Sequence, residues 1–319
     1  MGAATDDQRI GPRDTTISVI IATYRRAAFV EQNLQHLRRQ SRVPDEILVI
    51  DASEDEATRD VVAGFPEARY IANPAAAGNT ASSRNVGFDA SEGEILAFLD
   101  DDAYPRPAYL AELEAFCTGR PDALLGCART LNDQPGEADG DASTIGRFEA
   151  DGEMTANFAV AAPVPVPIGH GIGATMWFRR SLAEDLGGVR ELFYGTCYRE
   201  ETDIFLRAHA LGAQAWFVPS AVADHVAGPH AKGKRFDRRY VYWAARNDAV
   251  MAIVNFGVRS PAFRRLRRET FSLPDGRAIH RRLARWSIRV YGFARGCAFT
   301  VRRFGLGPDT PKGRYVRRK

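Results

Sequence analysis

Short apolar runs alternate with amphipathic stretches over the first 130 residues of the chain. Four of the runs have the β-branched and aliphatic composition of buried strands, at residues 17–22, 46–50, 69–72 and 94–99. Three stretches carry apolar residues at helical spacing, at residues 27–39, 54–63 and 78–90. Strands that alternate with helices form βαβ units, in which a mostly parallel sheet is covered on both faces. The pattern therefore predicts an α/β fold.

Polar side chains follow three of the predicted strands at the point where each strand ends. In open α/β sheets, ligands bind outside the carboxyl ends of the strands. The residues at these ends are Thr23 and Tyr24, Asp51 and Ser53, and the triplet Asp100–Asp102. We therefore expect a binding site at this edge of the sheet.

The second half of the chain has a less regular pattern. Residues 132–157 are rich in Asp, Gly, Glu and Ala and predict a loop, and the alternate prolines of residues 161–168 require an extended segment. A glycine-spaced turn at 169–173 precedes an apolar run at 174–178. Further on, the pattern predicts a helix at 200–211, a strand at 215–218, and helices from 238 onward that are interrupted at Pro261 and at 274–276.

Composition places the chain among folded globular proteins. Of 319 residues, 45% are apolar and 26% are charged. The four cysteines form no CxxC pair, which argues against a disulfide framework and favours a reducing compartment. Residues 1–15 are polar, unlike a signal peptide, and no apolar run approaches the roughly 18 residues of a membrane-spanning helix. We expect a flexible N-terminus on a cytoplasmic protein.

Charge divides the chain into two parts. Residues 1–231 contain 19 Lys and Arg against 35 Asp and Glu, whereas residues 232–319 contain 24 against 5. An acidic body with a basic extension indicates an anionic partner, such as a membrane surface or a nucleic acid. The alternative is that the extension packs on the acidic body or is solvated.

The triplet Asp100–Asp102 is the sharpest chemical feature of the sequence. Three adjacent carboxylates at the end of a buried strand repel one another unless a cation neutralises them. Hard carboxylate oxygens suit Mg²⁺ or Mn²⁺, which commonly complete their coordination with phosphate oxygens. The triplet therefore predicts a metal–diphosphate site, and the alternative is a solvated acidic turn.

Five segments, in order along the chain, resemble motifs of family 2 of the inverting glycosyltransferases, which have the A-type glycosyltransferase fold. Residues 20–26 resemble V-I-P-T-Y-N-R, 49–55 V-D-D-G-S-T-D, 78–87 G-x-x-x-A-R-N-x-G, 99–102 the D-x-D element, and 200–207 E-D-x-D-L-x-x-R. Departures include Ile50 and Glu201, where the family commonly has aspartate. The resemblance implies a nucleotide-diphospho-sugar transferase fold with a mixed, mainly parallel sheet.

The resemblance also implies a division of labour along the chain. Residues 16–231 would form the catalytic domain, with a nucleotide-binding half at 16–130 and an acceptor half at 160–231, and residues 232–319 a basic helical extension. The implied nucleotide-binding residues are Thr23, Tyr24, Arg25, Asp51, Ser53, Gly78, Arg84, Asp100 and Asp101. Asp102 would be the main ligand of Mn²⁺ or Mg²⁺, together with Asp100 and His225.

An inverting transfer needs a base that removes a proton from the acceptor hydroxyl. By position in the motif this is Glu201, with Asp203 as the other candidate; the alternative is an acidic helix N-terminus that the helix dipole favours. The acceptor and sugar pocket is expected at Glu200, His170, Gly171, Gly173 and Trp177. The alternative for Trp177, which lies in an apolar run, is a position in the core. The alternative for His225 is a packed or surface position without a ligand.

The basic extension combines arginines with aromatic residues at helical spacing. Arg281, Arg282, Arg285 and Arg289 interleave with Trp286, Tyr291 and Phe293, and further basic residues follow at 302–303 and 314–319. Such a helix suits the plane of an anionic membrane, and the alternative is a helical subdomain that docks its aromatics on the body. Residues 240–248 also resemble a Y-x-x-R-N stretch of rhamnosyl-type members of the family.

The sequence thus predicts a metal-dependent inverting glycosyltransferase that uses a UDP-, dTDP- or GDP-sugar. Its acceptor would be a hydroxyl of a glycan, lipid-linked or polysaccharide precursor of the cell envelope, reached from the inner face of the membrane. One rival is a sugar nucleotidyltransferase, although the glycine-rich loop it needs after the first strand is missing. Others are a polyanion- or nucleic-acid-binding protein that acts through the extension, and an inactive relative.

Overall fold

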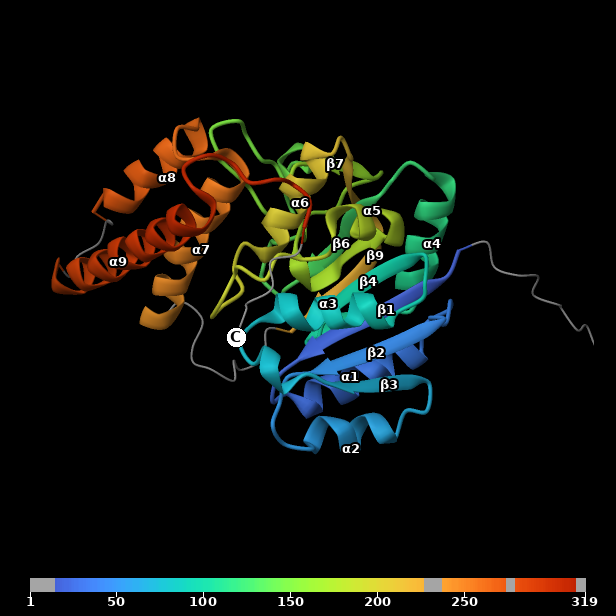
Figure 1. Ribbon diagram of the computed structural model, residues 1–319. Helices are drawn as coiled ribbons and strands as arrows, with labels where there is room; N and C mark the ends of the chain where they lie inside the picture. Colours follow the sequence, from blue (N-terminus) through green and yellow to red (C-terminus); the bar gives the residue numbers. More distant parts are fainter. Residues whose placement is uncertain (1–14, 227–236, 274–278, 314–319) are drawn as a thin grey trace, which may run out of the picture.

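A nine-stranded mixed sheet forms the centre of the molecule (Figure 1). The computed structural model describes residues 15–226, 237–273 and 279–313. The strand order is β3-β2-β1-β4-β8-β6-β9-β5, and β7 pairs with β9. The strands are β1 Ile17–Thr23, β2 Glu46–Asp51, β3 Ala68–Ala72, β4 Ile95–Asp100, β5 Ala103–Pro105, β6 Leu125–Leu131, β7 Val166–Ile168, β8 Met176–Arg179 and β9 Ala215–His225.

Helices cover both faces of the sheet, as the alternating pattern predicts. Helices α1 Ala27–Arg38, α2 Ala57–Ala63 and α4 Tyr109–Gly119 pack their apolar residues on one face. Helices α3 Thr80–Ala90, α5 Arg180–Leu186 and α6 Glu200–Ala210 pack on the other. Short 3₁₀ turns lie at Pro74–Ala76, Ala142–Thr144 and Gly173–Thr175. The prediction of an α/β fold is confirmed.

The register of the parallel strands brings the polar strand ends to one edge. Strand β1 pairs with β2 so that Thr23 lies opposite Asp51, and with β4 so that Ala22 lies opposite Asp100. Beyond β4 the sheet changes direction, because β8 pairs antiparallel with both β4 and β6. Strand β9 then runs parallel to β6 and antiparallel to β5.

The pattern analysis assigned no element to residues 103–131, where the structure has β5, α4 and β6. Strand β6 lacks a long apolar run and contains Gly126. A Cβ at that glycine would lie 2.1 Å from the carbonyl oxygen of Trp216, so the close approach of β9 explains why a glycine interrupts the strand.

The basic extension forms three helices, α7 Arg238–Phe256, α8 Pro261–Phe271 and α9 Ile279–Phe304, which lie beside the sheet domain (Figure 1). Helices α7 and α9 touch backbone to backbone, since a Cβ at Gly292 would lie 2.3 Å from the carbonyl oxygen of Tyr242. Phe293 is buried between the helices. Phe293 is therefore packed inside the extension, among residues of α7 and α8.

Within the described ranges, none of the helices is both long enough and apolar enough to cross a membrane. The predicted flexible segment falls almost entirely outside the described residues, as do the basic residues 314–319.

Candidate active site

A cavity of about 420 Å³ opens where the strands β1, β2 and β4 end. Its walls also include the N-terminal turn of α3, the turn at 172–174, the loop at 195–198, and the beginnings of α6 and α7. The predicted site residues that line it are Thr23, Tyr24, Gly78, Arg84, Asp100, Asp101, Asp102, Gly173, Glu201 and His225. The cavity thus lies at the sheet edge where the sequence places it.

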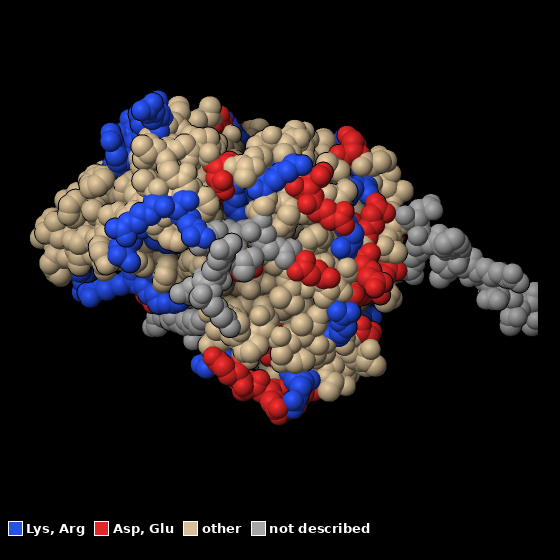
Figure 2. Space-filling model, viewed as in Figure 1, with Lys and Arg blue, Asp and Glu red and all other residues tan. Residues whose placement is uncertain are grey.

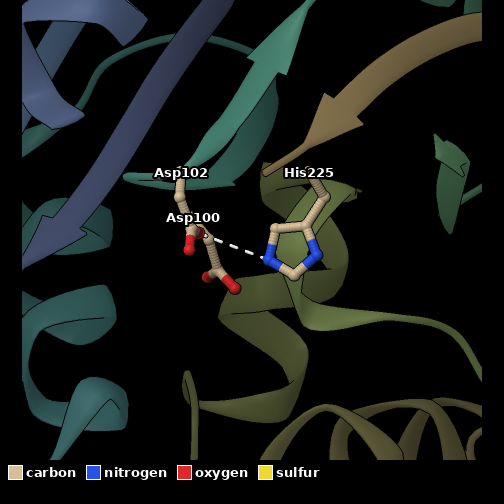
Figure 3. Close-up of side chains that lie close together, drawn as sticks. All are labelled: Asp100, Asp102 and His225. Carbon is tan, nitrogen blue, oxygen red and sulfur yellow. Dashed lines mark ion pairs between the residues drawn. The ribbon is translucent and has the colours of Figure 1, made fainter. Parts of the chain in front are cut away.

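Three of these residues bring together side-chain atoms of the kinds that could hold a metal ion (Figure 3). One ligand atom each from Asp100, Asp102 and His225 lies within 4.8 Å of the others. Strand pairing explains the assembly, because β5 follows the aspartate triplet and aligns Ala103 with His225 at the end of β9. A histidine nitrogen beside carboxylate oxygens is a donor set that fits Mn²⁺.

Contacts within this group and with Asn132 and Asn33 hold its members in place. His225 Nδ1 lies 3.0 Å from Asn132 Oδ1, while its Nε2 lies 3.3 Å from Asp102 Oδ1. The side-chain amide of Asn33 donates to the carbonyls of Asp100 and Ala103, each at 3.0 Å. Because one buried amide binds the carbonyls on both sides of the segment 100–103, it restricts the backbone that carries the aspartates.

The triplet is neutralised in part by Arg26, which the sequence analysis did not place in the site. Its guanidinium lies 2.7 Å from Asp101 Oδ1 and 2.7 Å from Asp102 Oδ2. Burial opposes the charge of Asp102, but His225 and Arg26 together lower the pKa of this carboxyl below its usual range. Burial raises the pKa of Asp101 to about 7, although Arg26 and a hydrogen bond from Thr23 act against the rise.

Arg84, on helix α3, lines the cavity and contacts three other segments of the chain. Its Nη1 donates to Glu200 Oε1 at 2.7 Å, and its Nη2 donates to Asp100 Oδ1 and the carbonyl of Gly173, each at 3.1 Å. Burial opposes its charge, yet the carboxylates of Glu200 and Asp100 raise the pKa of Arg84 further above its usual value. Much of the donor capacity that we expected for a diphosphate therefore goes to protein acceptors.

The acidic residues at the start of α6 face different surroundings. Glu201 lines the cavity and is partly exposed, and burial raises the pKa of its carboxyl. Glu200 is buried on Arg84, and burial raises its pKa to about 7. Asp203 lies outside the cavity lining, fully buried between Arg190 at 3.1 Å and Asn255 at 2.8 Å.

Several predicted pocket residues lie outside the cavity lining. Trp177 is fully buried in the core against Phe116, with ring centroids 5.7 Å apart, so it offers no stacking surface. His170 is buried with its Nε2 2.8 Å from the carbonyl of Thr155. Gly171 faces the ring of Phe205, where a Cβ would lie at 2.1 Å. These are corrections to the expected acceptor pocket, since apolar packing takes these positions.

Three expected nucleotide-binding residues, Asp51 at the end of β2 and Ser53 and Arg25 in the loops after β2 and β1, support the backbone beside the cavity. Asp51 Oδ1 accepts hydrogen bonds from the backbone N–H of Ser53 at 2.9 Å and its hydroxyl at 2.6 Å. The Ser53 hydroxyl oxygen in turn accepts from the backbone N–H of Arg25 at 2.7 Å. The Arg25 side chain pairs with Glu54 at 2.8 Å and is half exposed. The three residues thus lie outside the cavity lining.

Helix α7 and the residue before it form a part of the cavity wall that was not predicted from the sequence. Asp237, Arg239 and Tyr240 line the cavity, and the rings of Tyr198 and Tyr240 lie 6.1 Å apart. The signal was present in the Y-x-x-R-N stretch, because Asn247 of that stretch ties α7 to the body by a 3.1 Å hydrogen bond to the carbonyl of Tyr194. The extension is therefore part of the site.

Curated proteins resemble this chain in sequence. The chain is 29% identical over 219 residues to the succinoglycan biosynthesis protein ExoM of Rhizobium meliloti, a match that covers 66% of this chain and 67% of that protein. It is 33% identical over 118 residues to the validoxylamine A glucosyltransferase of Streptomyces hygroscopicus subsp. limoneus, a match that covers 35% of this chain. That match spans only 26% of the glucosyltransferase.

Solved structures show the same fold at low sequence identity. GalNAc-T7, solved with UDP, GalNAc and Mn²⁺, superposes with a TM-score of 0.62 at 15% identity, over 92% of this chain and 59% of that one. The mannosyltransferase PcManGT of Pyrobaculum calidifontis, solved with GDP-Man and Mn²⁺, gives a TM-score of 0.51 at 20% identity, over 91% and 77%. The fold is thus the A-type glycosyltransferase fold that the motifs imply.

The family model for "Glycosyl transferase family 2" matches residues 18–187, more than half of the chain. The matched range includes β1, β2 and β4, whose ends carry the cavity. The chain belongs to glycosyl transferase family 2.

Proposed function

We propose that this protein transfers a sugar from a nucleotide diphosphate donor to a hydroxyl acceptor, with inversion at the anomeric carbon. The observation that carries the proposal is the arrangement of one cavity. Asp100, Asp102 and His225 line it as one group, and Glu201 lines it from a separate element, helix α6. A cation site and a separate base are the two groups that a direct displacement needs.

Asp100, Asp102 and His225 would hold a divalent metal ion, Mn²⁺ or Mg²⁺. When bound, such an ion supplies positive charge to the departing diphosphate. Two neighbours of the same fold, GalNAc-T7 and PcManGT, were solved with Mn²⁺ and a nucleotide or nucleotide sugar, which supports this part of the proposal.

Glu201 would act as the base. Its carboxylate accepts the proton of the acceptor hydroxyl while the acceptor oxygen forms a bond to the anomeric carbon and the bond from that carbon to the diphosphate oxygen breaks. Its pKa is raised by burial, toward the working pH that suits a general base. Asp203 is disfavoured because its carboxylate is held by Arg190 and Asn255 outside the cavity lining.

We infer that the acceptor is a saccharide of a polysaccharide precursor. The similarity to a succinoglycan biosynthesis protein supports this class. The tyrosines Tyr198 and Tyr240 line the cavity near Glu201 and offer aromatic surface of the kind that sugar rings contact.

Calorimetric titration with UDP, dTDP and GDP, each with and without Mn²⁺, tests the donor site. We expect metal-dependent binding of one nucleotide, lost in Asp102→Asn and kept in the control Asp122→Asn, whose side chain is exposed outside the cavity. The proposal fails if the folded protein binds none of the three nucleotides, or if Asp102→Asn binds like the wild type.

A further inference from the structure

An apolar stripe on helix α9 continues past the helices on which it packs. Phe293 and Cys297 pack in a cluster with residues of α7 and α8, and Trp286 donates to the carbonyl of Phe271 at the end of α8, at 3.2 Å. Leu283 and Ile279 extend the same stripe by two further steps at helical spacing. They lie beyond the last residue of α8 and are 46% and 52% exposed.

Two more apolar side chains join this end of the molecule. Phe271 is 52% exposed and Leu273 is 42% exposed. The chain is fixed there against α9, because Arg289 donates to the carbonyl of Ser272 and the ring of Phe271 lies edge-on to Phe293 at 6.1 Å. We call the four residues Phe271, Leu273, Ile279 and Leu283 the α8–α9 tip. A cluster of exposed apolar side chains marks an interaction surface.

Arginines surround the tip. Helices α8 and α9 contain eleven arginines and a single acidic residue, Glu269, which pairs with Arg265 at 2.7 Å. Arg267, Arg281 and Arg285 are exposed, and no acidic side chain of the described residues lies within ion-pair distance of them. Figure 2 shows blue side chains around the end of the molecule that α8 and α9 form, whereas red ones gather over the body.

We propose that the α8–α9 tip binds an anionic lipid bilayer. Apolar side chains surrounded by arginines match the two layers of such a surface, the acyl boundary and the lipid phosphates. Arg281 and Arg285 project from the side of α9 opposite to Ile279 and Leu283. Their long aliphatic stems let each guanidinium reach the lipid headgroups while the tip inserts end-on. A nucleic acid would use the arginines but leaves the four apolar side chains without a role.

The tip lies at the end of the helix pair that faces the cavity. Gly292 contacts Tyr242 and Gly296 contacts Arg246, so α9 and α7 run in the same direction. Residues 279–287 therefore precede the level at which α7 begins, and the first residues of α7, Arg239 and Tyr240, line the cavity. A bilayer on the tip places its lipids on the side where α7 opens onto the site. This last step, which makes the acceptor lipid-linked, rests on the proposed function.

Vesicle flotation with the full-length protein tests the binding itself. We expect binding to vesicles made of equal parts of phosphatidylglycerol and phosphatidylcholine, roughly tenfold or more above that to phosphatidylcholine alone, and weakened by salt. The variant Leu273→Ser/Ile279→Ser/Leu283→Ser and the variant Arg267→Gln/Arg281→Gln/Arg285→Gln should each lose most of it. Matched controls on the body, Val43→Ser/Val164→Ser and Arg59→Gln/Arg69→Gln, alter exposed side chains of the same kinds and should bind like the wild type.

Three results would overturn the proposal: no binding to the anionic vesicles, equal binding by the apolar variant and the wild type, or equal loss in the controls. Retained vesicle binding by the apolar variant, with competition by DNA, would assign the arginines to a nucleic acid. Nucleotide titration of the same variants separates this test from the proposed function, because the substituted side chains lie outside the cavity lining. A protein that binds nucleotide but no vesicles would overturn the proposed membrane surface and would leave the proposed transferase function intact.

Discussion

Arg84 and Glu200 form a buried ion pair at 2.7 Å that joins helix α3 to helix α6. The other end of the guanidinium contacts Asp100 at 3.1 Å. One side chain therefore links the metal-ligating group to the helix turn that carries Glu201. The second carboxylate oxygen of Glu200 has no hydrogen-bond partner among the described residues. Arg84 is therefore the group that compensates the buried charge of this carboxylate.

Removal of the arginine should destabilise the fold. Arg84→Ala leaves Glu200 buried without its cation, which typically costs about 3–5 kcal/mol of the free energy of unfolding. The double variant Arg84→Met/Glu200→Leu should recover much of that loss, because it removes both charges. Urea denaturation measures both, with Arg59→Ala as an exposed control whose effect stays below about 1 kcal/mol. A stable Arg84→Ala protein would contradict the role of the pair.

Substitution of Glu201, the proposed base, should affect the chemical step and spare donor binding. Glu201→Gln keeps the shape of the side chain but removes proton acceptance, which typically lowers kcat by about a hundredfold to ten-thousandfold. Release of the nucleoside diphosphate from the donor that calorimetry identifies gives the rate. Glu31→Gln, exposed on α1 outside the cavity lining, serves as the control. An unchanged kcat in Glu201→Gln would remove this residue from the base position.

The fall of kcat at acidic pH should reflect protonation of Glu201. Because burial raises the pKa of Glu201, its carboxylate is lost at a higher pH than that of an exposed glutamate. The rate therefore falls as the pH drops through this raised value, and Glu201→Gln loses this fall while its residual rate stays flat. The measurement is kcat between pH 4 and pH 9. A fall that persists in the variant would belong to another group.

Metal affinity should depend on how His225 is held. His225→Ala removes a proposed ligand, and Asn132→Ala removes the 3.0 Å contact between Asn132 Oδ1 and the Nδ1 atom of the imidazole. Loss of such an outer contact typically weakens metal binding by about 10–100-fold, and loss of the ligand should weaken it more. Electron paramagnetic resonance of free Mn²⁺ measures the affinity without any substrate. Equal affinity in His225→Ala and the wild type would exclude the histidine from the site.

Acid should destabilise the fold through His170. Burial lowers the pKa of this imidazole to about 4, whereas an unfolded chain protonates it near 6.5. The unfolded state thus binds one more proton between these values, so stability falls by roughly 3 kcal/mol as the pH drops from 6.5 to 4. His170→Gln should make the pH dependence of the urea midpoint shallower in this window, and the exposed His280→Gln should not. An unchanged dependence in His170→Gln would contradict the burial effect.

The local pattern of the sequence determined the α/β fold and the edge of the sheet that carries the site. Hydrophobic periodicity reports which residues of a segment are buried, and the parallel strands end at Thr23, Asp51 and Asp100 as their apolar runs predict. The motif also predicts Glu201 as the base, a role that stays a prediction, and the structure places this residue in the cavity lining.

Only the tertiary structure decided which distant side chains meet. The antiparallel pairing of β5 with β9 brings His225 to the aspartate triplet, and no periodicity specifies that pairing. Helical spacing likewise places Glu201 and Asp203, two residues apart, on different faces of α6 without saying which faces a cavity and which faces Arg190. The cavity wall from α7 depends on packing between segments far apart in the chain. Local sequence determines the faces of each element, whereas the contacts between elements depend on which strands pair and which helices pack on them in the complete fold.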